Sequence, residues 1–375
     1  MAASSSSQDQ AIAIVSTGCF HKALWIPHTP DHPQLRVTYA TTTNFDSVSL
    51  PVILFISPMF GLRWSALHFD KLARECGVRI ICVDRPGFGG SMLVHLNLRM
   101  RVWLETIPIL LEKVQVKHVN IVTHSAGTMY TLNTLCKLRS ILDPKAPYVA
   151  FLAPYVPFVH SGATLPSVAS KLPVAMIDSL SGISTFVNNK IRPSASWSGG
   201  IISAAAQFAF PPSTDVPTAE PSSSTTPLER YGYDKDTAET IEKLSFKYQF
   251  QESTKGANEE AKLCLGKCNE DDWGEAADYL CCIRTIAVNE SSTSRGSDVA
   301  RLKVEAFFAG SDVMIGKRGQ QFFEQCWQRQ EVAGEVDFKT SAFPEADHDS
   351  VLVDHKKGAL KVVFERIAAL SRNSG

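Results

Sequence analysis

Short apolar runs alternate with longer amphipathic runs along the first part of the chain. The apolar runs are rich in β-branched residues, which is typical of buried strands. The longer runs have helical periodicity, and the one at residues 65–76 begins with a serine cap and is closed by Gly77. Strands that alternate with helices predict a parallel sheet with crossover helices. We expect strands at residues 51–56, 78–83, 118–123 and 148–152, and helices at 65–76, 96–114 and 126–139.

This alternation stops near residue 155 and returns near residue 302. The intervening segment is rich in Ser, Pro and Ala, with helical patterns at residues 228–251 and 258–288. Residues 211–227 are of low complexity, and we expect a disordered or mobile loop there because they can bury little apolar surface. Beyond the segment, the pattern predicts strands at 302–309 and 336–340 and helices at 317–330 and 350–370.

A parallel sheet that is interrupted late and then completed predicts an α/β fold with flanking helices and a helical cap insertion. Open α/β sheets bind ligands at the carboxyl ends of their strands, so an insertion at this point would cover that edge as a lid. We expect a disordered N-terminal tail, a first core part, the cap and a last core part, at residues 1–11, 12–154, 155–301 and 302–375.

Charge and targeting signals narrow the class of partner. Lys and Arg total 37 against 38 Asp and Glu, so no basic surplus indicates nucleic acid or an anionic membrane. The longest apolar run, residues 50–62, is too short to span a bilayer and contains two prolines. The N-terminus lacks the basic start of a secretory signal. We therefore expect a cytoplasmic protein with a small-molecule partner and no integral membrane association, and its oligomeric state stays open.

The cysteines favour neither disulfides nor a metal. The chain has nine, an odd number, which we expect to be thiols in a reducing compartment. A zinc site prefers paired Cys-x2-Cys spacing, and vicinal cysteines are poor ligands for one tetrahedral ion. We therefore expect buried thiols, with no metal and no cofactor, at the one local concentration of cysteines, which comprises Cys264, Cys268, Cys281 and Cys282.

The string Thr123-His124-Ser125-Ala126-Gly127 follows a predicted strand and opens a predicted helix. In this context a serine lies on a sharp, strained turn with its hydroxyl exposed, an arrangement called a nucleophile elbow. The turn needs small residues two positions to either side, which Gly127 supplies and Thr123 does not. Taken alone, the string is equally compatible with a serine that caps a helix.

Two further strings precede the elbow: ISPMFG at residues 56–61 and DRPGFGGS at residues 84–91. With these strings in this order, the chain resembles the α/β-hydrolase superfamily, above all its lidded esterases and epoxide-hydrolase-like members. The resemblance covers residues 50–153 and 302–370, and DRPGFG is its most specific part. It implies the α/β-hydrolase fold and a serine hydrolase.

The resemblance also implies an oxyanion hole made of two backbone N–H groups. In the family a His-Gly pair ends the strand before the first helix, and the next residue donates. Here Ser57-Pro58 stands in that place, so the donors would be Met59 and, at the positive end of the elbow helix, Ala126. A plain strand-to-helix loop is the alternative. Asp84 is expected to tie its own turn together and is not assigned to catalysis.

A serine nucleophile needs a base, and the base needs a third group to orient it. In the family the chain order is serine, acid, histidine, with acid and base on loops after late strands. Asp312 directly follows one late strand and His348 lies beyond the next, so the resemblance implies a catalytic triad of Ser125, Asp312 and His348. Taken singly, Asp312 is also compatible with a turn residue and His348 with a surface or cap position. We assign Phe60 and His124 to the substrate pocket.

A serine rather than an aspartate at the elbow disfavours dehalogenase or epoxide hydrolase chemistry through an alkyl-enzyme ester. The expected function is hydrolysis of a carboxylic ester, thioester or lactone of a small, apolar substrate through an acyl-enzyme. Two alternatives stay open. One is a non-hydrolytic enzyme of this fold, an acyltransferase, lyase or cyclase. The other is a ligand-binding protein with a decayed site, of which Ser57-Pro58 and Thr123 would be signs.

Overall fold

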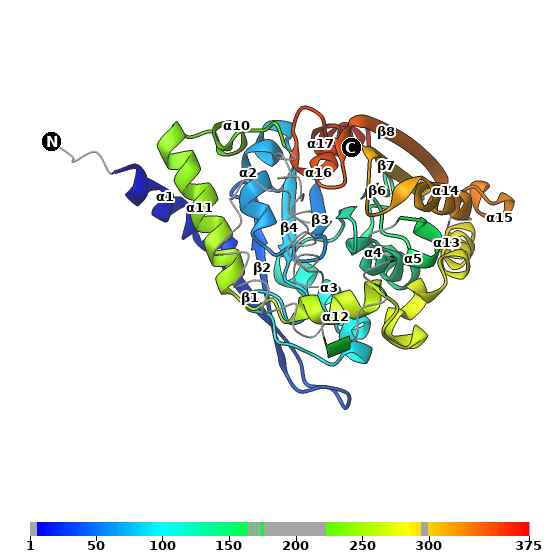
Figure 1. Ribbon diagram of the computed structural model, residues 1–375. Coiled ribbons are helices and arrows are strands. Elements are labelled where there is room, and N and C mark those ends of the chain that lie inside the picture. Colours follow the sequence, from blue (N-terminus) through cyan, green and yellow to red (C-terminus); the bar gives the residue numbers. More distant parts are fainter. Residues whose placement is uncertain are drawn as a thin grey trace, which may run out of the picture.

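An eight-stranded sheet runs through the centre of the protein, with strand order β1-β2-β4-β3-β5-β6-β7-β8 (Figure 1). The computed structural model describes residues 6–163, 223–293 and 299–374, together with 167, 170, 174 and 175. β1 and β2 pair antiparallel, β2 pairs antiparallel with β4, and the remaining pairs are parallel. The strands are β1 (Lys22–Ile26), β2 (Leu35–Thr41), β3 (Val52–Ile56), β4 (Arg79–Val83), β5 (Asn120–His124), β6 (Tyr148–Leu152), β7 (Lys303–Ser311) and β8 (Asp337–Asp347).

Helices cover both faces of the sheet, and each face has its own apolar core. One core includes side chains of α3, α4, α13 and α14, and the other includes side chains of α1, α2, α11 and α17. Every residue of β3 to β6 is buried, as expected for strands covered on both faces. The helices are α1 (Ser7–Val15), α2 (Ser65–Cys76), α3 (Arg99–Lys113), α4 (Gly127–Lys137), α5 (Phe158–Ser161), α10 (Pro227–Tyr231), α11 (Lys235–Gln251), α12 (Gly256–Cys264), α13 (Tyr279–Thr293), α14 (Gly316–Trp327), α15 (Gln330–Ala333), α16 (Ser350–Val353) and α17 (Leu360–Ser374), with 3-10 turns at Gly18–Phe20, Leu96–Leu98, Arg139–Ile141 and Glu270–Ala277.

The expected α/β fold with a mostly parallel sheet is confirmed, and most predicted elements lie within a few residues of their expected bounds. Two details differ. Ser65 is the first residue of α2 and makes no capping bond, because the N-cap position falls on Trp64. The last predicted helix, residues 350–370, is two helices. Asp354 ends the first by accepting the N–H groups of Lys356 and Lys357, which closes a turn before α17.

Strands β1 and β2 were not predicted. The prediction of a disordered tail at residues 1–11 is wrong for the part of that range that the structure describes. Helix α1 begins at Ser7, and its N-cap Ser6 forms a reciprocal capping box with Asp9. Ala11 and Val15 on this helix are buried in the same core as α11. Figure 1 shows α1 lying beside α11. A cap at one end and an apolar face are enough to fold this short segment onto the protein.

The segment between β6 and β7 is helical in its described parts and carries α5 and α10 to α13. The expected mobile loop at residues 211–227 lies outside the described residues as far as residue 222. Its last part contacts the core, since the Ser224 N–H and hydroxyl both donate to the Asp354 carboxylate, at 2.5 and 2.7 Å. Among the residues described, no helix combines the length and the apolar character needed to cross a membrane.

Candidate active site

Ser125 lies on a sharp turn between β5 and α4. Its backbone φ is +50°, a left-handed conformation that side chains other than glycine rarely adopt. Three backbone bonds hold this turn. The Ser125 N–H donates to the Leu152 carbonyl at 3.1 Å, and the Ser125 carbonyl accepts from the N–H groups of Thr128 at 2.9 Å and Tyr155 at 3.2 Å. The serine is partly exposed, whereas its immediate neighbours in sequence are buried. This is the geometry that the sequence predicted for a nucleophile elbow.

The two residues that flank the elbow fit together closely. A Cβ atom on Gly127 would lie 2.4 Å from the Thr123 Oγ1 atom and 2.5 Å from the Ile56 carbonyl oxygen, so only glycine fits there. Thr123, where the family has a glycine, is accommodated without a shift of the strand, because it stays in register opposite Ile56. Its hydroxyl donates to the Ile56 carbonyl at 3.2 Å.

Asp312, His348 and Ser125 form one hydrogen-bonded chain. The His348 Nδ1 atom lies 2.9 Å from Asp312 Oδ2, and its Nε2 atom lies 2.9 Å from Ser125 Oγ. The sheet explains why acid and base meet, since Ser311 at the end of β7 pairs with Asp347 at the end of β8. Asp312 directly follows Ser311, and His348 directly follows Asp347. The structure therefore brings together the three residues that the sequence singled out.

The charges within this chain favour the positive form of the imidazole, which a base takes when it accepts a proton. Burial alone would raise the pKa of the Asp312 carboxyl, but His348 and the N–H groups of Met314 and Ile315 outweigh it and lower that pKa. Burial alone would likewise lower the pKa of His348, but the Asp312 carboxylate raises it above its ordinary value. Asp347, the residue directly before His348, accepts the N–H groups of Asp349 and Ser350 in the turn after β8.

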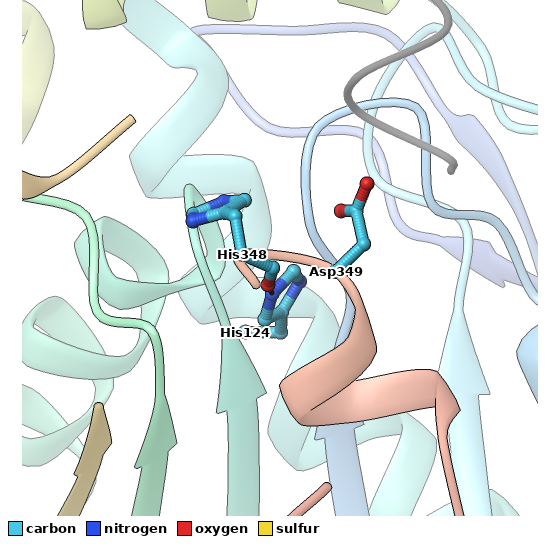
Figure 2. A group of neighbouring side chains, drawn as sticks. All are labelled: His124, His348 and Asp349. Atoms are coloured by element: carbon cyan, nitrogen blue, oxygen red, sulfur yellow. Dashed lines mark hydrogen bonds between the residues drawn. The ribbon is translucent and has the colours of Figure 1, made fainter. Parts of the chain in front are cut away.

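His124 lies beside His348, the candidate base, and supports its loop (Figure 2). Its Nε2–H donates to the backbone carbonyl of His348 at 2.7 Å, and the two rings lie 5.0 Å apart. Burial, followed by the charge of His348, lowers the pKa of His124 to about 4. Its Nδ1 atom has no hydrogen-bond partner among the described residues. We predicted a substrate-pocket role for His124 from its place in the sequence; the residue lines a small cavity, and its hydrogen bond is to the loop that carries His348.

His124, His348 and Asp349 each offer an atom that could ligate a metal, and these atoms lie within 4.8 Å of one another (Figure 2). Both ring nitrogens of His348 are already hydrogen-bonded, to Asp312 and to Ser125. A metal bound by His348 would therefore have to break the hydrogen-bonded chain. The arrangement fits a held imidazole better than a metal site.

The candidate oxyanion donors lie on two loops at the carboxyl ends of β3 and β5. Met59 is partly buried in the loop after β3, and Ala126 is the N-cap residue of α4. Phe60, the other predicted pocket residue, is buried in the core with φ of +62°, and its carbonyl accepts from Gln249 of α11. The prediction did not include Arg85, whose guanidinium donates to the carbonyls just before Met59. Its only signal was its place in the DRPGFG string.

A small cavity lies beside His124, on the side of the sheet covered by α2. Ser125 is not among its lining residues. Its walls come from the loop after β3, α2, the end of β5, α10 and α16, and the lining residues are Pro58, Ser65, His68, Phe69, His124, Arg230, Asp349, Leu352 and Val353.

Comparisons with known proteins agree with this fold. A family model described as "Alpha/beta hydrolase family" matches residues 53–357. No curated protein matches the sequence. A carboxylesterase from the thaumarchaeon Nitrososphaera gargenis superposes with a TM-score of 0.51 at 13% identity, over 93% of this chain and 100% of that one.

Two further solved structures have similar likeness. A thermophilic esterase from Thermogutta terrifontis gives a TM-score of 0.52 at 12% identity, over 94% of this chain and 99% of that one. A bromoperoxidase from Bacillus anthracis gives 0.52 at 12% identity, over 93% and 98%. At these identities the likenesses establish a shared fold.

Proposed function

The chain belongs to the alpha/beta hydrolase family, and from this premise we propose that it is a serine hydrolase of a carboxylic ester, thioester or lactone. The observation that supports this proposal is the chain of hydrogen bonds from Asp312 through His348 to the strained Ser125. A serine hydroxyl becomes nucleophilic when a base lies within hydrogen-bond reach and a third group orients that base. The esterase neighbours are consistent with this chemistry.

The proposed reaction has two halves. His348 Nε2 takes the proton of Ser125 as its Oγ attacks the substrate carbonyl, and the carbonyl oxygen becomes an oxyanion. The intermediate then expels the alcohol, thiol or lactone oxygen, which takes the proton from His348, and leaves an acyl-enzyme. A water, deprotonated in turn by His348, attacks the acyl group and releases the acid and the serine.

Two features would stabilise the charges that develop. The N–H groups of Met59 and Ala126 would bind the oxyanion, the second of them at the positive end of α4. The Asp312 carboxylate would stabilise the imidazolium of His348 and keep Nδ1 protonated in the resting state. The pKa directions of the two groups support these roles, since each ion favours the other.

We further propose that residues 155–301 form the cap of this site and that the substrate is a small apolar one. The cap leaves the sheet at β6 and returns at β7, directly before Asp312. Lids in such positions exclude water and shape the pocket, so substrate choice would be set there.

The test is labelling by a fluorophosphonate probe together with hydrolysis of p-nitrophenyl esters of graded acyl length. Ser125→Ala should abolish labelling and lower kcat/KM by about 10,000-fold or more while the protein stays folded. The matched control is Ser57→Ala. That serine is buried in the loop after β3, and within the part of the chain that the structure describes its hydroxyl has no hydrogen-bond partner.

The control should label and turn over like the parent. Labelling of Ser125 without hydrolysis of any ester would favour an acyltransferase, lyase or cyclase of this fold. A parent protein that the probe does not label would favour a binding protein with a decayed site.

A further inference from the structure

Hydrogen bonds from a buried arginine hold the loop that carries Met59. Arg85, from the loop after β4, donates through Nη1 to the Ser57 carbonyl at 2.6 Å and through Nη2 to the Pro58 carbonyl at 2.7 Å. Only 1% of its side chain is exposed. The Pro58 carbonyl also accepts the Gly61 N–H at 2.8 Å, which closes the turn around Met59. The loop is therefore fixed at the two carbonyls that directly precede the proposed oxyanion donor.

The Pro58 carbonyl and the Met59 N–H belong to the same peptide unit. In a planar trans peptide these two groups point in opposite directions, and the described residues contain no cis peptide bond. A guanidinium that holds the Pro58 oxygen thus sets the direction of the Met59 N–H. If this peptide rotated, the proposed donor would turn away and a carbonyl oxygen would face the oxyanion.

The other side of Arg85 is held by the inserted segment. Glu260 of α12 accepts from Arg85 Nε at 2.5 Å and from Nη2 at 2.9 Å, and it also accepts from Arg99 and Tyr130, each at 2.9 Å. Neither Glu260 nor Arg99 has an exposed side chain. Burial alone would raise the pKa of Glu260, but the two arginines outweigh it and lower that pKa. The carboxylate is therefore charged, and it is the anion that the two buried cations share.

Close backbone contacts fix where Glu260 lies. The Gly256 N–H at the start of α12 donates to the Gly87 carbonyl at 2.9 Å, and the Gly89 N–H donates to Ser253 at 2.8 Å. A Cβ atom on Gly87 would lie 2.8 Å from the Gly256 nitrogen, and one on Gly256 would lie 2.5 Å from the Pro86 carbonyl oxygen. The DRPGFG loop and the start of α12 thus meet backbone to backbone, with no room for side chains between them.

We propose that Arg85 is a positioning residue that aims the Met59 N–H at the oxyanion, and that Glu260 of the insertion holds Arg85 in that place. This inference rests on the proposed function. On this inference the insertion has two roles. It covers the site, and through Glu260 it helps to position a donor of the oxyanion hole.

A second ion pair supplies the matched control. Glu252, at the end of α11, pairs with Arg63 at 2.5 Å. Arg63 holds Asp84 at 2.7 Å, and it donates to neither carbonyl that Arg85 holds. Glu252→Gln therefore makes the same chemical change as Glu260→Gln, in the same insertion and opposite a buried arginine, without releasing the Met59 loop.

The test compares kcat, KM and inhibition by a trifluoromethyl ketone, whose adduct with Ser125 carries an oxyanion. Arg85→Lys keeps the charge next to Glu260, so the variant should fold, but an ammonium has three donors on one atom and cannot replace the four bonds that the planar guanidinium makes. We expect kcat to fall by about 10- to 100-fold and the inhibition constant to rise by the same factor, with KM within about threefold. Glu260→Gln should lower kcat and raise the inhibition constant by smaller factors. For Glu252→Gln, both quantities should stay within about twofold of the parent's values.

Three outcomes would overturn the inference. One is a folded Arg85→Lys with parental kcat. Another is a fall in kcat with an unchanged inhibition constant, which would indicate a general loss of structure around the site. The third is an equal effect of Glu252→Gln. If the parent protein showed no hydrolysis that depends on Ser125, the proposed function would be wrong, and this inference would be wrong with it.

Discussion

The two halves of the candidate site are held in different ways. Ser125, His348 and Asp312 follow the ends of three core strands, and core residues hold them through backbone pairing and direct hydrogen bonds, with one further bond from Tyr155, the first residue of the insertion. The loop around Met59 also follows a core strand, but its carbonyls are held by Arg85, and Arg85 is held by a carboxylate of the insertion. The comparison teaches that the proposed nucleophile is built within the core, whereas the proposed oxyanion hole is built across the boundary between core and insertion.

The two halves also differ in how they depend on charge. The core half has the buried carboxylates of Asp312 and Asp349 next to the imidazole of His348. The loop half has Arg85, Arg99 and Glu260 fully buried together, two cations for one anion. Removing one partner from such a cluster leaves an uncompensated buried charge, which costs about 3–5 kcal/mol. We therefore expect charge-removing variants of the loop half to lose stability as well as turnover, and those of the core half to lose mainly turnover.

The largest effect that separates the halves should come from Asp312→Asn. An amide in this place favours the wrong imidazole tautomer, so kcat should fall by about 10,000-fold while KM and the thermal unfolding temperature change little. Asp347→Asn is the control. Its carboxylate holds the turn at Asp349 and Ser350, and the substitution should reduce kcat by less than about tenfold. If instead Asp347→Asn inactivated the enzyme and Asp312→Asn did not, the acid would be Asp347.

Sequence reasoning was more successful for the core half than for the loop half, for a physical reason. Ser125, Asp312 and His348 each follow a strand directly, and an apolar run that ends in a polar residue is visible in the sequence. The partner of Arg85 is 175 positions away in the chain, and it follows another glutamate, Glu259, whose side chain is partly exposed. Nothing local tells these two glutamates apart. Only the packing of α12 against the DRPGFG loop selects Glu260.

The fold shows the same limit. The buried runs of β3 to β6 were visible because both faces of these strands are covered. β1 alternates exposed and buried residues at the edge of the sheet, and that strand was missed. The hydrogen bond from His124 to the His348 carbonyl was not predicted either, since it joins residues 224 positions apart.

The next largest effect should be the dependence of kcat/KM on pH, which reports on the core half. The proposed base must be neutral, and the Asp312 carboxylate raises the pKa of His348 above its ordinary value of about 6.5. Activity should therefore be constant at higher pH and fall about tenfold per unit as pH drops below this raised pKa. In Asp312→Asn the residual activity should fall off at a lower pH, because the group that raises the pKa is gone. Identical profiles for the two proteins would contradict this account of His348.

A smaller effect is expected from His124→Phe, which tests whether the hydrogen bond from His124 supports the loop that carries His348. Phenylalanine fills the ring volume but leaves the buried His348 carbonyl without its donor, at a cost of about 1–3 kcal/mol. We expect kcat to fall by about tenfold with KM unchanged, and His124→Gln, which restores an amide donor, to recover part of the loss. Steady-state kinetics on both variants decide this. A fully active His124→Phe would show that the loop needs no such support.

The smallest effect on activity should come from Thr123→Gly, at the point where the two halves meet. Thr123 belongs to the elbow strand, and its hydroxyl binds the Ile56 carbonyl, directly before the Met59 loop. Glycine would remove two buried carbon atoms, one hydrogen bond and some backbone stiffness, so the free energy of unfolding should fall by about 3 kcal/mol. Thr123→Ser, which keeps the hydroxyl, should lose only about 1 kcal/mol. Since Thr123 stays in register opposite Ile56 and the bonds of Ser125 to His348 and Leu152 do not involve it, kcat should stay within about threefold in both variants. Urea unfolding and steady-state kinetics measure the two quantities separately. A rise in kcat of tenfold or more in Thr123→Gly would instead mean that the threonine strains the elbow and weakens the proposed nucleophile.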